Sequence, residues 1–189
     1  VDKNNMKVKT FLPYASSTGN TTDQLYDLGV LEDQLYLFYR SGLLICYNLK
    51  SHQEIYRQKL PDELPKGKYE NTSYVVPGNN TFYQLRNGSQ GGVMLNYDIT
   101  RKKWNIVFQT DYRLNSLSID KDSSIWVSCY MGLWNIDAGL INKQYIPNLK
   151  LVDGRTINTE VSTLYNDNQG GMWLGTLDRG ILYYHPNRF

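Results

Sequence analysis

Arginine, tyrosine and other polar side chains occur in four short turn segments of this 189-residue chain. An arginine guanidinium presents a planar fork of donors, and tyrosine combines an apolar ring with a polar tip. Together they suit a polyhydroxylated or anionic ligand. The candidate ligand-binding residues are Tyr39, Arg40, Arg86, Asn87, Tyr130, Asp178 and Arg179. Solvated turns have a similar composition in any protein, so the prediction depends on whether the fold brings these turns together.

Residues that could carry out catalysis are few. The two histidines, His52 and His185, have no cysteine partner at a recognisable spacing, and no glycine-rich phosphate loop is present. A glycosidase needs two carboxylates that face each other across a cleft. The glutamates are scattered in predicted loops, at positions 32, 54, 63, 70 and 160. We therefore predict no catalytic residue and no cofactor.

A metal site is also not expected. Asp120 and Asp122 resemble the start of a calcium loop, but the further oxygen ligands that such a loop requires are missing. The alternative is structural, because an aspartate in a turn accepts hydrogen bonds from nearby backbone amides. We expect Asp120 and Asp167 to end strands in this way.

The elements that must position the turns are indicated by an internal repeat. Residues 117–128 recur as residues 164–175 without a gap, at an offset of 47 residues. Weaker copies lie upstream, where Tyr36 and Tyr83 correspond to Trp126 and Trp173. Several short strands in a repeat of this length are typical of a β-propeller blade.

The sequence therefore predicts an all-β fold, a β-propeller with four blades of four antiparallel strands. The predicted blades are 22–60, 73–110, 113–147 and 160–189 of a single domain or segment. The fourth repeat lacks an outer strand, whereas residues 6–12 form a surplus one. That strand could close a small ring, or the chain could be cut from a larger propeller of seven or eight blades.

Ten residues are expected to hold the repeat together. Trp126 and Trp173 are predicted to pack between adjacent blades, because such rings bury large areas. Gly170 is predicted to supply a positive φ in a tight turn. The full set is Tyr36, Tyr83, Asp120, Trp126, Gly132, Asp167, Gly170, Trp173, Gly175 and Gly180.

Composition excludes several classes of protein. The formal net charge is +2 and the basic residues are scattered, so the sequence shows no basic cluster of the kind that binds nucleic acid. No apolar run approaches the roughly 20 residues that a membrane-spanning helix needs. Cys46 and Cys129 lie in different repeats and are predicted to be buried and unpaired.

The third and fourth repeats share a more specific pattern. An inner strand ends at an aspartate, a turn follows, and an apolar–Trp–apolar strand leads to a further glycine turn. This pattern resembles the two-component regulator propeller repeat. The matching residues are Thr163–Asp167, Gly170, Met172–Thr176 and Gly180–Pro186. In the third repeat Ser128–Cys129 replaces Gly–Thr, and the first two repeats have Tyr in place of Trp.

The resemblance implies a role in sensing. Such repeats occur in the periplasmic part of bacterial hybrid two-component histidine kinases, which commonly respond to oligosaccharides. It implies that this chain is part of the input module, with an oligosaccharide ligand and the remaining blades or domains of the same receptor as partners. A homodimer is a further candidate. The alternatives are a propeller-fold glycosidase or lyase and a purely structural interaction scaffold.

Overall fold

The computed structural model describes residues 23–64 and 68–185, apart from the side chains of residues 72–74. The chain divides into two compact units, Val1–Leu60 and Pro61–Phe189, and each is described by itself. The described residues form seventeen strands in antiparallel sheets and contain no helix that could cross a membrane. The predicted all-β, propeller-type fold is confirmed. The predicted outer strand at 6–12 lies outside the described residues.

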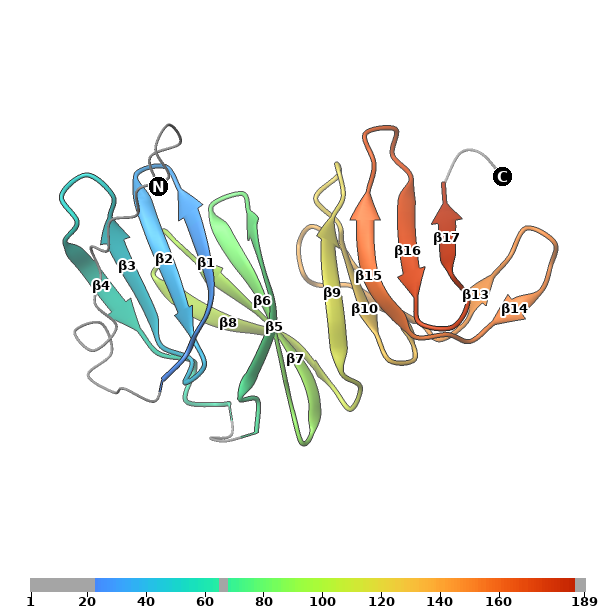
Figure 1. The fold of residues 1–189 in the computed structure, drawn as a ribbon, viewed down its shortest axis with the longest axis horizontal. Helices are drawn as coiled ribbons and strands as arrows, with labels where there is room; N and C mark the ends of the chain where they lie inside the picture. The colour runs from blue at the N-terminus through green and yellow to red at the C-terminus, as the bar shows by residue number, and fades with distance from the viewer. Residues whose placement is uncertain (1–22, 65–67, 186–189) are drawn as a thin grey trace, which may run out of the picture. The chain divides into compact units, whose positions relative to one another are not determined.

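The described residues of the first unit form one four-stranded sheet in the order β1-β2-β3-β4, which can be followed in Figure 1. Each strand pairs with the next in sequence, so the sheet is an antiparallel meander. A cluster of buried residues lies on β2 and β3: Leu35, Leu37, Tyr39, Ile45 and Tyr47. The strands are β1 (Leu25–Leu31), β2 (Gln34–Tyr39), β3 (Leu44–Asn48) and β4 (Glu54–Gln58).

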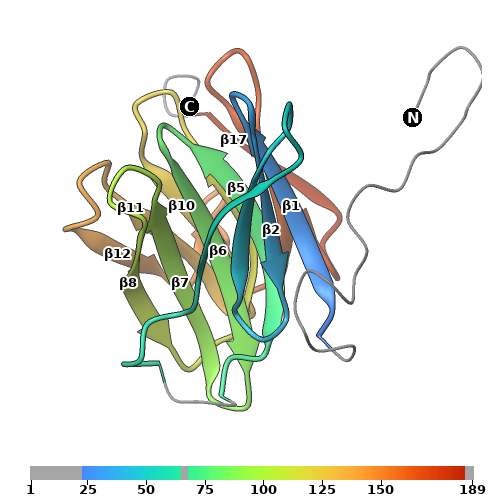
Figure 2. The same ribbon diagram turned by 90° about the vertical axis from the view of Figure 1, so that its left-hand side faces the viewer.

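The second unit contains three further sheets of the same kind. The second sheet has the order β5-β6-β7-β8, seen in Figure 2, and the third has the order β12-β11-β10-β9. Their strands are β5 (Asn71–Gly78), β6 (Thr81–Gly88), β7 (Gly91–Asp98), β8 (Lys103–Thr110), β9 (Leu114–Ile119), β10 (Ile125–Cys129), β11 (Gly132–Ile136) and β12 (Lys143–Ile146).

The fourth sheet has three strands, in the order β15-β16-β17. They are β15 (Val161–Asn166), β16 (Met172–Thr176) and β17 (Ile181–Tyr184). The connection before it forms a two-stranded hairpin of β13 (Leu149–Lys150) and β14 (Thr156–Ile157).

The repeat seen in the sequence corresponds to a repeat of strand pairing. Tyr36, Tyr83, Trp126 and Trp173 each lie in the second strand of their sheet, paired on both sides. Trp126 pairs with Ser118 and Asn135, and Trp173 pairs with Tyr165 and Tyr183. The intervals in the sequence therefore correspond to one sheet per repeat.

Neighbouring sheets of the second unit bury apolar faces against each other. Between the second and third sheets the cluster includes Leu85, Met94, Leu114 and Val127. Between the third and fourth sheets, Leu133 packs with residues of β15 and β16, and Trp126 lies against the same cluster. The fourth-sheet members are Val161, Leu164, Met172 and Leu174.

The two tryptophans of the repeat differ in their surroundings. Trp126 is partly buried between the third and fourth sheets, as predicted from its apolar neighbours. The prediction that Trp173 packs between blades is wrong for this structure, because Trp173 is 44% exposed. Its ring contacts Tyr183 of the same sheet, with ring centroids 4.5 Å apart. No sheet follows β15–β17 within the described residues of this unit to cover it.

Asp167 organises the turn between β15 and β16. Its Oδ1 accepts hydrogen bonds of 2.8 Å from the amides of Gln169 and Gly171, and its Oδ2 accepts one of 3.1 Å from the Tyr183 hydroxyl. Gly170 has φ of +86°, which few other residues adopt without strain. In the third sheet, Asp120 accepts from the Lys121 amide and Asp122 accepts from the Ser124 amide.

The Asp167 turn predicts a dependence of stability on pH. The hydrogen bond from the Gly171 amide, followed by that from Gln169, lowers the pKa of the Asp167 carboxyl. A carboxyl with a lowered pKa in the folded state contributes stability that is complete above its ordinary pKa. This contribution is lost as the pH falls from the ordinary pKa through the lower, folded-state pKa.

We expect Asp167→Asn to remove this acid-dependent part. Urea unfolding at pH 6 and pH 3, followed by tryptophan fluorescence, measures it. The difference in stability between the two pH values should be smaller in Asp167→Asn than in the parent. Asp62→Asn is the control, because no hydrogen bond or ion pair of the Asp62 side chain is seen among the described residues. This variant should have the same acid sensitivity as the parent. Equal acid sensitivity in the parent and Asp167→Asn would contradict the assignment.

Candidate ligand-binding site

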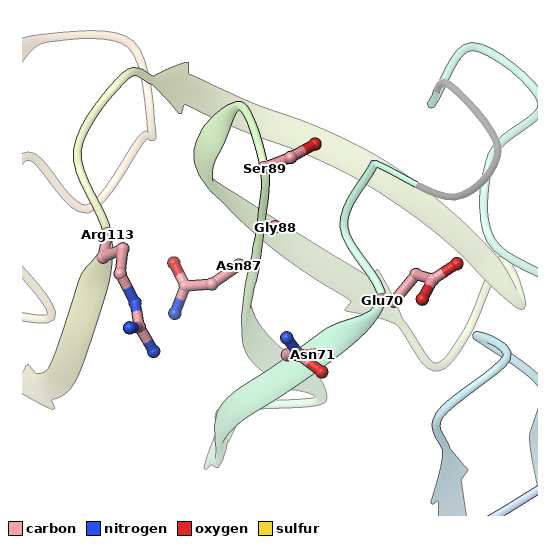
Figure 3. Close-up of a pocket in the computed structure, with 6 residues that line it drawn as sticks. All are labelled: Glu70, Asn71, Asn87, Gly88, Ser89 and Arg113. Atoms are coloured by element: carbon pink, nitrogen blue, oxygen red, sulfur yellow. The ribbon is translucent and has the colours of Figure 1, made fainter.

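A polar pocket of about 330 Å³ lies in the second unit, where β5 begins, β6 ends and β9 begins. It is lined by Glu70, Asn71, Asn87, Gly88, Ser89 and Arg113. Figure 3 shows Arg113 and Glu70 at opposite sides of this group, with Asn87 and Asn71 between them. The lining therefore combines one guanidinium, one carboxylate, two amides and a hydroxyl.

The pocket forms because two loops approach the β6–β7 turn. A Cβ atom at Gly88 would lie 1.4 Å from the carbonyl oxygen of Lys68, so a larger residue would displace the loop before β5. The same loop is tied to the turn by a hydrogen bond of 2.9 Å from Lys68 Nζ to Gln90 Oε1. Glycine at position 88 is thus a requirement of this close approach.

Asn87 joins the β6–β7 hairpin to β9. Its Nδ2 donates to the carbonyl of Leu114 and its Oδ1 accepts from the amide of Leu114, both at 2.8 Å. Asn87 is 3% exposed and Leu114 is fully buried. This two-way contact fixes the residue after Arg113 and so holds the guanidinium beside the pocket.

The predicted position of Arg86 is corrected by the structure. The sequence suggests a turn over residues 86–90, but β6 continues to Gly88 and the turn is only Ser89–Gln90. Arg86 is 1% exposed, and its Nε donates a hydrogen bond of 2.7 Å to the carbonyl of Tyr69. A buried charge persists only when it is hydrogen-bonded, so Arg86 secures the loop before β5.

Arg113 and Tyr112 were not among the sequence candidates. They lie in the loop between β8 and β9, and β9 is the first strand of the third sheet along the chain. The sequence candidates, by contrast, lie at turns that follow the second strand of a sheet. Arg113 is exposed, and no hydrogen bond or ion pair to its side chain is seen among the described residues. Its carbonyl accepts a hydrogen bond of 3.1 Å from the amide of Tyr130. The structure therefore brings the candidate Tyr130 next to Arg113.

An aromatic group borders this end of the third sheet. Tyr112 stacks on Tyr145 with ring centroids 5.8 Å apart and an interplanar angle of 21°. Tyr145 also contacts Trp134 and donates a hydrogen bond to the carbonyl of Met131. Burial raises the pKa of Tyr145 to about 12, so its hydroxyl stays a donor at neutral pH. Tyr112 and Tyr130 are 37% and 55% exposed and offer ring surface to solvent.

The candidates of the first unit lie at a similar turn of the first sheet. Tyr39 was predicted to be a loop aromatic, but it is the last residue of β2 and is 2% exposed in the core. Arg40 follows it and is exposed. The turn is held by Asp23, which accepts hydrogen bonds from the Ser41 amide at 2.9 Å and the Ser41 hydroxyl at 2.6 Å.

The candidates of the fourth sheet, Asp178 and Arg179, are exposed and pair with each other, with Nε and Oδ2 3.1 Å apart. The Thr159 hydroxyl also donates to Asp178. In the first sheet the carboxylate (Asp23) precedes the first strand and the hydroxyl (Ser41) follows the second strand. In the fourth sheet the hydroxyl (Thr159) precedes the first strand and the carboxylate (Asp178) follows the second. Both pairs hold the turn after a second strand to the segment before a first strand.

The described residues contain no group of three or more His, Cys, Asp or Glu side chains that could hold a metal ion. The two cysteines, Cys46 and Cys129, are buried, and no disulfide joins them. Glu70 is the one carboxylate among the six residues that line the pocket. The arrangement provides hydrogen bonding and charge for binding a polar molecule.

The family model of the two component regulator propeller matches residues 157–178. These residues include β15, the Asp167 turn and β16. The chain carries a two-component regulator propeller repeat. The predicted resemblance is thereby confirmed, although the model covers only this one propeller repeat. No curated protein matches the sequence.

Solved structures share the fold at low sequence identity. The chain is similar to PorZ, a surface component of the type-IX secretion system of Porphyromonas gingivalis, with a TM-score of 0.63 and 10% identity over 86% of this chain and 26% of PorZ. It is also similar to the computationally designed Ika4 protein, with a TM-score of 0.60 and 12% identity over 88% of this chain and 93% of that one.

A third match is to the extracellular domain of a one-component system of B. thetaiotaomicron. Its TM-score is 0.44 at 17% identity, over 82% of this chain and 26% of that one. The chain thus spans about a quarter of the length of each of these two natural chains. At these identities the matches with PorZ and Ika4 show a shared fold and carry no information on activity.

Proposed function

We propose that this chain is a non-catalytic, ligand-sensing propeller segment of an extracytoplasmic hybrid two-component receptor, and that it binds an oligosaccharide. The observation that carries the proposal is the polar pocket at one end of the second and third sheets, in a chain that contains a two-component regulator propeller repeat. The periplasm is the proposed location, because receptors of this class sense molecules outside the cytoplasm.

The composition of the pocket supports a polyhydroxylated ligand. Amides, a hydroxyl and a carboxylate can each hydrogen-bond a sugar hydroxyl, and the Arg113 guanidinium can donate to two oxygens of one ligand. Exposed Tyr112 and Tyr130 belong to the same end of the third sheet and offer apolar ring surface for the faces of sugar rings. The proposed binding residues are Asn71, Ser89, Tyr112, Arg113 and Tyr130, and Asn87 is proposed to position Arg113 through Leu114.

A catalytic role is less well supported. Glycoside hydrolysis requires a pair of carboxylates, one on either side of the bond that is broken. Among the six residues that line the pocket, Glu70 supplies the one carboxylate. We infer that the segment signals by binding. A ligand shifts such a receptor only through a difference in its affinity for two arrangements of the protein.

Isothermal titration calorimetry of the chain against a panel of oligosaccharides tests the proposal. We expect saturable heat with at least one oligosaccharide, and Arg113→Ala should weaken its binding about tenfold or more, because hydrogen bonds to a charged group are worth about 1.5–3 kcal/mol. Arg101→Ala is the matched control, since Arg101 is an exposed arginine in the turn between β7 and β8.

Three results would contradict the proposal. Absence of heat across the panel would favour a structural scaffold. Equal affinities of the parent and Arg113→Ala would place binding elsewhere. Shortened oligosaccharides on chromatography of the incubated mixture would identify an enzyme.

A further inference from the structure

The third and fourth sheets repeat one main-chain contact at the turn after the second strand. In the third sheet the carbonyl of Arg113 accepts a hydrogen bond of 3.1 Å from the amide of Tyr130. In the fourth sheet the carbonyl of Glu160 accepts one of 3.2 Å from the amide of Leu177. Tyr130 and Leu177 each follow the last residue of the second strand of their sheet. Arg113 and Glu160 therefore occupy the same position in successive repeats, with opposite charges.

An amide side chain of the preceding sheet holds each of these two residues in place. Asn87 of the second sheet fixes the residue after Arg113 through its two hydrogen bonds. Asn115 of the third sheet donates a hydrogen bond of 3.0 Å to the carbonyl of Val161, the buried residue after Glu160. Its Nδ2 also donates to Glu160 Oε1 at 3.1 Å. No hydrogen bond to Glu160 Oε2 is seen among the described residues, so this oxygen is available to a ligand.

The Glu160 carboxylate lies close to the third sheet. Burial raises the pKa of the Cys129 thiol, and the negative charge of Glu160 contributes in the same direction. Cys129 is the last residue of β10 and directly precedes Tyr130. Glu160 therefore reaches toward the turn that carries Tyr130, in the same way that Arg113 of the third sheet lies beside Asn87 of the second.

Exposed apolar surface accompanies this carboxylate. Tyr130 is 55% exposed and Leu177 is 69% exposed. A carboxylate accepts hydrogen bonds from neighbouring sugar hydroxyls, and apolar side chains contact the less polar face of a sugar ring. The third and fourth sheets thus offer the same combination of charge and apolar surface as the second and third, with Glu160 in place of Arg113.

We propose that the ligand site continues past the pocket into a second subsite, formed by Tyr130, Glu160 and Leu177. The inference rests on the proposed function, because it assigns the place where the rest of the same oligosaccharide binds. Packed sheets lie about 10 Å apart, which is longer than one sugar ring. Asn71 and Glu160 belong to sheets with a third sheet between them, so a single sugar cannot contact both. The favoured ligand is therefore a linear chain of several sugar units that runs across the third sheet.

Titration calorimetry with oligosaccharides of increasing length tests the proposal. The probes run from the monosaccharide to the hexasaccharide of cellulose, xylan, mannan and galacturonan. We expect the affinity of the parent chain to rise with length in at least one series, because longer members reach the second subsite. Glu160→Gln should weaken binding of the longest members about threefold or more, because hydrogen bonds to a charged group are stronger than those to a neutral one. Binding of the shortest members that bind should not change.

Further variants separate the second subsite from the pocket. Glu160→Gln keeps an oxygen that accepts the hydrogen bond from Asn115, so the local fold is retained. Leu177→Ser changes an exposed side chain and should show the same dependence on length. Arg113→Ala should weaken binding of every length alike. Glu32→Gln, at an exposed glutamate in the turn between β1 and β2, is the matched control and should bind as the parent does.

Three results would overturn the second subsite and leave the proposed function intact. The first is an affinity that does not rise with length in any series that binds. The second is parent-like binding of every length by both Glu160→Gln and Leu177→Ser. The third is an equal loss for short and long members in these variants. Absence of heat with every member of every series also overturns the inference, and the proposed function falls with it only if the wider oligosaccharide panel gives no heat either.

Discussion

Replacing Leu133 with alanine is expected to lower the free energy of unfolding of the Pro61–Phe189 unit by about 2–5 kcal/mol. Leu133 is 3% exposed and lies in the cluster that joins the third and fourth sheets. Truncation removes the apolar contacts of this side chain and leaves a cavity between the two packed sheets. Ile181→Ala is the matched control, because the same position of the next repeat is 73% exposed, and we expect a change within about 0.5 kcal/mol.

Urea unfolding followed by tryptophan fluorescence is suited to this comparison. All four tryptophans, at 104, 126, 134 and 173, lie in the Pro61–Phe189 unit, so their signal follows that unit. Equal destabilisation by the two substitutions would mean that the third and fourth sheets do not meet as described.

Replacing Asn87 with alanine is expected to destabilise the same unit by about 1–3 kcal/mol and to open the pocket. The side chain supplies both a donor and an acceptor to the main chain of Leu114, at 2.8 Å each, in a buried setting. Its loss frees the segment that carries Arg113. Ligand binding should therefore weaken even at temperatures where the variant is folded.

Asn105→Ala is the control for this substitution, because Asn105 is exposed on β8 and bonds only to the Asn96 side chain among the described contacts. Hydrogen exchange should show faster exchange at Leu114 in Asn87→Ala and no change there in Asn105→Ala. Parent-like exchange at Leu114 in Asn87→Ala would show that the amide is not needed to hold the loop.

The fold was accessible from the sequence because each repeat carries its own signals. An aspartate and a glycine at a turn, with a tryptophan between apolar residues, specify a strand–turn–strand unit locally, and Asp167 forms these bonds within its own turn. The spacing of four such units then predicts one sheet per unit. The exposure of Trp173 could not be predicted in this way, because it depends on whether a neighbouring sheet is present.

The site was less accessible, because it depends on where strands end and on contacts between repeats. The sequence predicts Arg86 and Tyr39 to be turn residues, but each is buried near the end of a strand that is longer than the repeat pattern predicts. Arg113 and Glu70 come from segments before first strands, and only the approach of both loops to Gly88 and Asn87 brings them together. Such contacts leave no periodic signal in a single sequence.

Hydrogen exchange with and without a saturating oligosaccharide identified by calorimetry tests the central claim, that ligand is bound at the pocket of the second and third sheets. The account predicts slower exchange in the presence of ligand in residues 68–71, 87–91 and 111–114, with little change in the turn between β7 and β8. Protection confined to other segments, or none at all, would contradict it.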